Sequence, residues 1–115
     1  MSELVEPFRT ADADRDEVLA AAAACVVAFG AHDTADYFDC FHPEATFLFH
    51  STGRLLGSRA EYEAEWAAWE SDGFRVLSCS SDDRRVDLWG DVAVLSHRVR
   101  TVVRPSWDAE YVEQL

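Results

Sequence analysis

The chain has 115 residues, the usual length of one domain, and its 22 acidic and 10 basic residues give a net charge of -12. Hydrophobic residues make up 49% and aromatic residues 12% of it, too large a share for a disordered acidic tail. So negative a surface repels phosphate backbones and anionic lipid headgroups. We therefore expect one folded acidic domain whose partners are neither nucleic acid nor a membrane.

The cysteines and the longest apolar stretch both indicate a cytoplasmic protein. Cys25, Cys40 and Cys79 are odd in number and lie in apolar segments, not at the paired spacings that hold zinc or staple secreted domains. Residues 18–31 form the longest apolar stretch, which is shorter than the ~20 residues of a membrane span and follows acidic rather than basic residues. We expect reduced cysteines, buried as small hydrophobic side chains.

The first predicted element is a helix, which follows an arm of residues 1–13 and opens a single domain of residues 14–115. Asp14 and Glu17 have the spacing of a capping box, and apolar residues recur at helical spacing until Gly30. The helix is therefore amphipathic. Its predicted core stripe is Leu19, Ala22, Val26 and Phe29.

A short helix and a hairpin are predicted next. Asp33 and Asp36 start the helix, and Pro43 ends it, because a proline disfavours helical geometry in the residue before it. Residues 45–50 are mostly β-branched or aromatic, a Ser-Thr-Gly turn follows them, and residues 54–56 complete the hairpin. Two helices thus precede the first strand.

A third helix and the long strands complete the pattern. Ser58 begins the helix with a second capping box, and three aromatic residues fall on one of its faces. Residues 74–80 and 84–89 predict one long bent strand or two short ones, and residues 92–103 predict the longest strand. Residues 110–115 can begin another strand.

Three short stretches carry a family resemblance. Residues 42–47 (HPEATF) precede the first strand, residues 57–62 (GSRAEY) enter the third helix, and residues 90–94 (GDVAV) turn into the longest strand. With the element order, they resemble the SnoaL-like and ketosteroid-isomerase-like branch of the nuclear transport factor 2-like superfamily. The resemblance implies an α+β fold: a cone-shaped, strongly curved antiparallel sheet wrapped around the three N-terminal helices, with a small-molecule pocket in the open end.

The resemblance also implies a homodimer formed through the outer face of the sheet. Residues 45–49 are apolar on both alternating faces, as expected where a second subunit covers one face, or where the chain itself covers both. Family members usually end with further long strands, whereas the last strand here is shortened at Leu115. A shortened variant, a fragment and an edge completed by a partner's strand are three alternatives that stay open.

His50 is the first predicted catalytic residue. In the ketosteroid isomerase branch a carboxylate near the end of the first strand shuttles a proton, and counting back from Gly53 places His50 at that position. Counting forward from Ala45 places Phe49 there. An imidazole can act as a general base near neutral pH, so it can replace the carboxylate. The alternative is a histidine that only hydrogen-bonds the turn.

His97 is the second predicted catalytic residue. Strand alternation places it on the same side as Ala93, Leu95 and Val99, so we expect it to be largely buried, hydrogen-bonded and within reach of the pocket. In that position it can exchange protons with a substrate as the acid–base partner of His50. The alternative is a core histidine that bonds a backbone carbonyl or a carboxylate.

Aromatic residues on two helices are the predicted substrate-binding wall. Aromatic stripes at helical spacing also form ordinary cores, so both interpretations apply. The predicted wall is Tyr37, Phe41, Tyr62, Trp66 and Trp69. Histidines and aspartates around the second helix show no recognised ligand spacing, so we expect neither a metal nor another cofactor. These residues are His32, Asp33, Asp36 and His42.

Two functions fit these patterns. The first is a small cofactor-independent isomerase, cyclase or hydratase that acts on an apolar molecule by acid–base chemistry. The second is a ligand-binding or dimerisation module of the same fold, since fold alone does not fix function. They differ in whether two titratable groups converge on one cavity.

Overall fold

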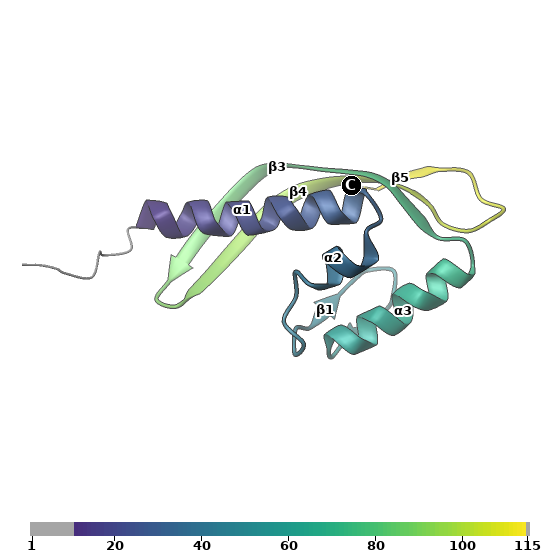
Figure 1. The fold of residues 1–115 in the computed structure, drawn as a ribbon, viewed down its shortest axis with the longest axis horizontal. Coiled ribbons are helices and arrows are strands. Elements are labelled where there is room, and N and C mark those ends of the chain that lie inside the picture. The colour runs from purple at the N-terminus through teal and green to yellow at the C-terminus, as the bar shows by residue number, and fades with distance from the viewer. Residues whose placement is uncertain (1–10, 115) are drawn as a thin grey trace, which may run out of the picture.

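Helices come first and antiparallel strands follow in the computed structural model of the protein, which describes residues 11–114 (Figure 1). The expected α+β class is confirmed. The predicted arm lies outside the described residues, except for residues 11–13. The helices are α1 (Ala11–Gly30), α2 (Thr34–Phe38) and α3 (Arg59–Ser71). The strands are β1 (Phe47–Leu48), β2 (Leu55–Leu56), β3 (Arg75–Trp89), β4 (Val92–Arg104) and β5 (Val112–Gln114).

Side-chain caps begin two of the three helices as the sequence predicted. The carboxylate of Asp33 accepts the backbone N–H of Asp36 at 3.1 Å, and the hydroxyl of Ser58 accepts the N–H of Glu61 at 3.2 Å. Helix α1 differs, because it already includes Ala11 and thus begins before the predicted start at Asp14. None of the described helices has the length and apolar character needed to cross a membrane.

The strands form two separate antiparallel units. Strands β1 and β2 make a two-stranded hairpin, and the main sheet has the order β3-β4-β5 and is not closed. Strand β3 is one continuous strand, but its register with β4 shifts between Val76 and Ser78 and again between Asp82 and Arg85. Bulges of this kind bend a strand and increase its twist. Of the two alternatives for this segment, the long bent strand is therefore correct.

Strand β4 is paired unequally on its two sides. Strand β3 pairs with it from Val92 to Arg104, whereas β5 pairs only with Thr101, Val102 and Val103. Within the described part of the chain, residues 92–100 of β4 thus have no strand on their second side. This part of the sheet projects, together with the start of α1, away from the lobe that contains α2, α3 and β1 (Figure 1).

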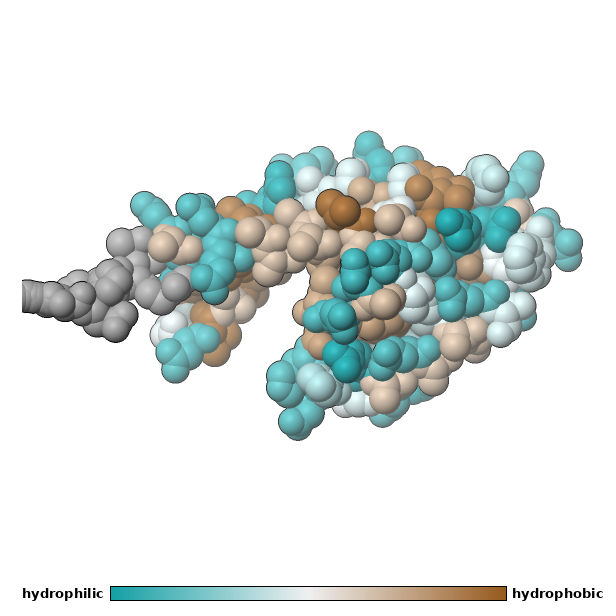
Figure 2. Space-filling view, viewed as in Figure 1, coloured by the Kyte–Doolittle hydropathy of each residue, from teal (hydrophilic) through white to brown (hydrophobic). Residues whose placement is uncertain are grey.

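The core lies inside that lobe and where the sheet joins it. Its largest fully buried side chains are Trp66, Leu56, Val76 and Val103. The predicted core stripe of α1 is only half-buried, and Ala28 is the residue of α1 that is buried. The reason is that α1 packs mainly on β3 and contacts β4 much less. Figure 2 shows the hollow that remains between the projecting end and the lobe.

Candidate functional site

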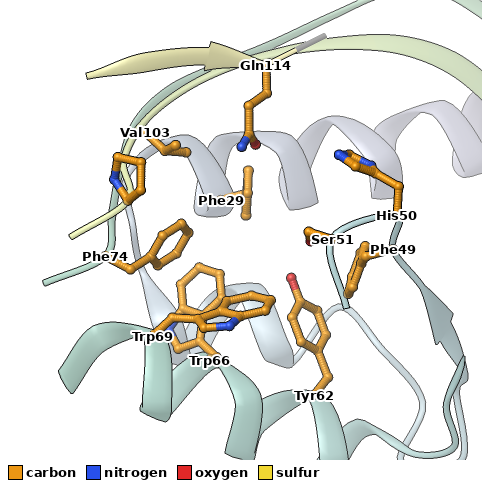
Figure 3. Close-up of a pocket in the computed structure, with 11 residues that line it drawn as sticks. Phe29, Phe49, His50, Ser51, Tyr62, Trp66, Trp69, Phe74, Val103 and Gln114 are labelled. Atoms are coloured by element: carbon orange, nitrogen blue, oxygen red, sulfur yellow. The ribbon is translucent and has the colours of Figure 1, made fainter. Parts of the chain in front are cut away.

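An aromatic cavity of about 320 Å³ lies between α3, the end of α1 and the last strands (Figure 3). Its wall is aromatic on the side of the helices, whereas His50, Ser51 and Gln114 add polar groups. The complete lining is Phe29, Phe49, His50, Ser51, Tyr62, Trp66, Trp69, Phe74, Val103, Pro105 and Gln114. Such a surface suits a flat apolar molecule that carries a few polar atoms.

Helix α3 supplies the floor of this aromatic cavity. Tyr62, Trp66 and Trp69 recur at the spacing of one helical face, so all three side chains point to the same side. Trp66 is 1% exposed and packs edge-to-face on Phe74, with 5.3 Å between the ring centroids. The structure places these three predicted residues together on the cavity wall. Their role in binding a ligand stays a prediction.

A polar network behind Trp66 holds this wall in place. The indole N–H of Trp66 donates to the hydroxyl of Thr34 at 3.2 Å, and that hydroxyl donates to Oε2 of Glu70 at 3.3 Å. The same oxygen lies 2.7 Å from Nε2 of His32. Because Nδ1 of His32 accepts the backbone N–H of Val76 at 2.9 Å, Nε2 carries the proton and donates it to Glu70. The network thus joins α3 to β3 and to the start of α2.

The histidine with a buried side chain is therefore His32, which sequence analysis named only among residues without a recognised metal-ligand spacing. Its side chain is 7% exposed, and its ring stacks on Trp66 with 5.0 Å between the centroids. Little in the sequence indicates this burial, because His32 adopts a backbone φ of 53°, which a sequence does not reveal. His32 does not line the aromatic cavity, so it positions the wall from behind.

Tyr62 is one half of a buried tyrosine pair. Its hydroxyl lies 2.8 Å from that of Tyr37. Burial raises the pKa of Tyr62 to about 12, although the hydrogen bond with Tyr37 lowers it in part. Burial, and after it the neighbouring Tyr62, raises the pKa of Tyr37 above its ordinary range. Both hydroxyls are therefore protonated at neutral pH. One of the two hydroxyl protons forms the hydrogen bond between the tyrosines, and the other hydroxyl proton can be donated to a ligand oxygen.

His50 lies at the polar side of the aromatic cavity and is exposed (Figure 3). The turn that follows it is closed by Thr52, whose hydroxyl donates to the carbonyl oxygens of Phe49 at 3.1 Å and Arg54 at 3.0 Å. The structure thus assigns the turn-closing role to Thr52, which sequence analysis did not single out. The position of His50 leaves its imidazole accessible to a molecule in the cavity.

His97 occupies a different hollow. It faces the same side of β4 as Leu95 and Val99, as strand alternation predicted, but the prediction that it is largely buried is wrong. Its side chain is exposed because α1 covers β3 and leaves this part of β4 open. Its Nδ1 lies 2.7 Å from the hydroxyl of Ser81 on β3. His50 and His97 therefore line separate hollows and do not form an acid–base pair in this conformation.

The second hollow, which we call the α1–β4 groove, has a volume of about 570 Å³ and is almost entirely apolar. It contains the other two predicted wall residues, Tyr37 and Phe41. Phe29 and Phe49 line both hollows, so they form the partition between them. The complete lining of the groove is Val18, Ala21, Ala22, Cys25, Val26, Phe29, Tyr37, Cys40, Phe41, Phe49, Cys79, Leu95, His97 and Val99.

The polar residues around α2 have structural partners. Asp33 caps the helix, His32 is bonded to Glu70, and Nδ1 of the exposed His42 accepts the backbone N–H of Glu44 at 3.0 Å. Over residues 11–114, no three side chains of histidine, cysteine, aspartate or glutamate are grouped in a way that could hold a metal ion.

Comparison with known proteins supports the fold alone. No protein-family model matches the chain, and no curated protein matches it. Among solved structures, Aln2 from a Streptomyces species is similar, with a TM-score of 0.62 and 19% sequence identity. The similarity covers 94% of this chain and 76% of Aln2. At this identity the likeness extends to the backbone arrangement and not to the residues of a site.

Proposed function

We propose that the chain is a small-molecule pocket protein of the SnoaL-like type, whose ligand is a flat, apolar molecule that carries a carbonyl or hydroxyl oxygen. The observation that carries the proposal is the position of Tyr62 in the wall of the aromatic cavity: it contributes a ring to the wall and, because it is hydrogen-bonded to Tyr37 behind it, a hydroxyl proton. Aromatic walls favour flat ligands, and a hydroxyl donor within the aromatic wall selects for an acceptor oxygen on the ligand.

The proposed chemistry is proton transfer without a cofactor. Tyr62 donates a hydrogen bond to the ligand oxygen, which stabilises the negative charge that develops there when a proton leaves the adjacent carbon. His50, on the polar side of the same cavity, accepts that proton and can return it to another position. His97 has no part in this scheme, because it lines the α1–β4 groove. The outcome is an isomerisation or the first step of a cyclisation. In a hydration, His50 would take the proton from the attacking water, Tyr62 would stabilise the enolate that forms, and the proton would then pass to the carbon.

Calorimetric titration with 2-naphthol and naphthalene tests the binding part. We expect 2-naphthol to bind more tightly, and Tyr62→Phe to remove that difference while it leaves naphthalene binding unchanged. One hydrogen bond contributes about 1 kcal/mol, which corresponds to a loss of roughly fivefold in affinity. Equal affinity of both compounds for the wild-type protein contradicts the role of Tyr62. Absence of binding of either compound contradicts the pocket.

Hydrogen–deuterium exchange into 2-tetralone tests the catalytic part, because this flat ketone has acidic protons next to its carbonyl. We expect the protein to accelerate exchange, as followed by proton NMR, and His50→Ala to remove most of the acceleration. His97→Ala is the matched control and keeps it. If 2-tetralone binds but does not exchange faster than in buffer, the alternative function, a non-catalytic binding module, is favoured.

We also propose a homodimer. The cross-strand pair Leu48 and Leu55 is 75% and 57% exposed on the hairpin, so the described part of the chain does not cover the second apolar face of β1. A second copy would cover it. Light scattering at micromolar concentration should give twice the chain mass, and Leu48→Glu should give the monomer. A monomeric wild-type protein would contradict the proposal.

A further inference from the structure

The three cysteines of the chain meet in the α1–β4 groove although they come from three separate elements. Cys25 lies on α1, Cys40 follows α2, and Cys79 lies on β3. Sequence analysis expected them to be buried individually. Instead, Cys25 and Cys79 are half-buried and Cys40 is exposed. A solvent-accessible groove with three thiols on its walls allows chemistry that isolated buried thiols do not.

Two of the three thiols in this groove influence each other's ionisation. The S–H of Cys40 donates to the carbonyl oxygen of Asp36 at 3.4 Å, and after burial the neighbouring Cys40 thiol is the main cause of the raised pKa of Cys25. Cys79 has another partner, because the hydroxyl of Thr101 donates to its sulfur at 3.7 Å. Within the shared groove, Cys40 therefore acts on Cys25 more strongly than Cys79 does, and the sulfur of Cys79 already has Thr101 as its partner.

We propose that Cys25 and Cys40 form a redox-active dithiol that a hydroperoxide oxidises to a disulfide in the wall of the α1–β4 groove. The disulfide would link α1 to the turn after α2. This site is independent of the aromatic cavity and of the function proposed for it, because neither cysteine lines that cavity.

The two cysteines have different roles in the oxidation. Cys40 is exposed, so its thiolate attacks the outer oxygen of the hydroperoxide; the O–O bond breaks, hydroxide leaves from hydrogen peroxide or an alkoxide from an organic hydroperoxide, and Cys40 becomes a sulfenic acid. Burial, and after it the contact with Cys40, raises the pKa of Cys25 to about 12, so Cys25 stays a thiol until that step has occurred. Its sulfur then attacks the Cys40 sulfur, the S–O bond breaks, and water leaves with the Cys25 proton. Two electrons pass from the thiols to the peroxide.

The decisive experiment is disulfide mapping of the reduced wild-type chain after one equivalent of hydrogen peroxide at low micromolar concentration. We expect one intramolecular link between Cys25 and Cys40, and titration of the denatured product should find one free thiol, that of Cys79, instead of three. A link that includes Cys79, a link between two chains, or three remaining thiols after the peroxide is consumed would each overturn the proposal.

Matched variants separate the roles of the three thiols. Cys79→Ser should lose both of its thiols on oxidation, whereas Cys25→Ser should stop at a Cys40 sulfenic acid that dimedone labels. Phenylarsine oxide, which bridges two thiols, should bind one equivalent to the reduced wild-type chain and to Cys79→Ser, but not to Cys40→Ser. Binding to Cys40→Ser would contradict the assignment. The wild-type map decides the question even if Cys25→Ser does not fold.

Discussion

The lobe that contains α2, α3 and the β1–β2 hairpin buries its aromatic side chains. The projecting end consists of the start of α1 and the ends of β3 and β4 that meet at their turn, and it leaves apolar side chains exposed (Figures 1 and 2). In the lobe, Trp66 is 1% exposed, while Trp89 and Val92 at the turn between β3 and β4 are 70% and 59% exposed. The comparison shows that apolar composition does not produce a core unless an element with large side chains covers it.

The composition of the two helices explains the difference. Helix α3 presents three aromatic side chains on one face, and each can bury a large apolar area. Helix α1 carries alanine at residues 20–24, and an alanine buries too little area to cover the strand opposite it. Packing free energy is therefore concentrated in the lobe, which also holds the aromatic cavity.

Trp66→Ala should cause the largest loss in the free energy of unfolding, and so test the contrast between the two regions most strongly. Removal of a buried tryptophan side chain costs about 3 to 5 kcal/mol, here with loss of the hydrogen bond to Thr34 as well. Val26→Ala in the half-buried face of α1 is the control and should cost about 1 kcal/mol. Urea unfolding measures both. Equal costs would show that the two regions are packed alike.

His32→Leu should have the next largest effect. The leucine leaves the N–H of Val76 without its acceptor and the carboxylate of Glu70 with Thr34 as its remaining donor, so we expect a loss of about 2 kcal/mol in the free energy of unfolding. Glu70→Gln is the control, because its amide oxygen still accepts from Nε2 of His32, and it should cost less than half as much. If His32→Leu leaves the free energy of unfolding unchanged, the network does not stabilise the lobe.

The tyrosine pair predicts a loss of stability at high pH. The pKa of Tyr62 is raised from 10.0 to about 12 in the folded chain, so above pH 10 the folded state holds more protons than the unfolded state. Stability is full below that pH and falls as the pH rises to 12, by up to about 1.4 kcal/mol per pH unit for one group. Tyr62→Phe should flatten this decline in melting temperature, whereas Trp69→Phe, which removes no titratable group, should not.

His97→Ala should have the smallest effect. The side chain is exposed, and its partner Ser81 is only half-buried, so water replaces their contact. We expect the free energy of unfolding to change by less than about 0.5 kcal/mol. A cost above about 2 kcal/mol would mean that this part of β4 is covered, and the contrast between the two regions would no longer hold.

Local signals predicted the parts of the structure that depend on neighbouring residues. The caps at Asp33 and Ser58 and the aromatic face of α3 follow from spacing within one helix, and all three are present. The resemblance in element order agrees with the α+β architecture. Strand β1 is shorter than residues 45–50, because few of these residues find a partner in the short β2.

The errors at the candidate site come from contacts between distant elements. Alternation placed His97 on the correct face of β4, but its exposure depends on which strand α1 covers, and the sequence of β4 does not contain that information. The burial of His32 depends on Glu70 and Val76, which lie far along the chain from it. Two histidines on suitable faces did not therefore imply one common cavity.

The unpaired side of β4 makes the protein vulnerable to self-association. Along residues 92–100 the backbone offers N–H and C=O groups to any strand that approaches, and an open edge of this kind is where chains stack into aggregates. Arg98 and Arg100 lie within this stretch and are exposed. They pair with Asp83 at 3.8 Å and with Glu113 at 3.6 Å, and pairing with another strand would take these charged groups out of water, which opposes stacking of the edge.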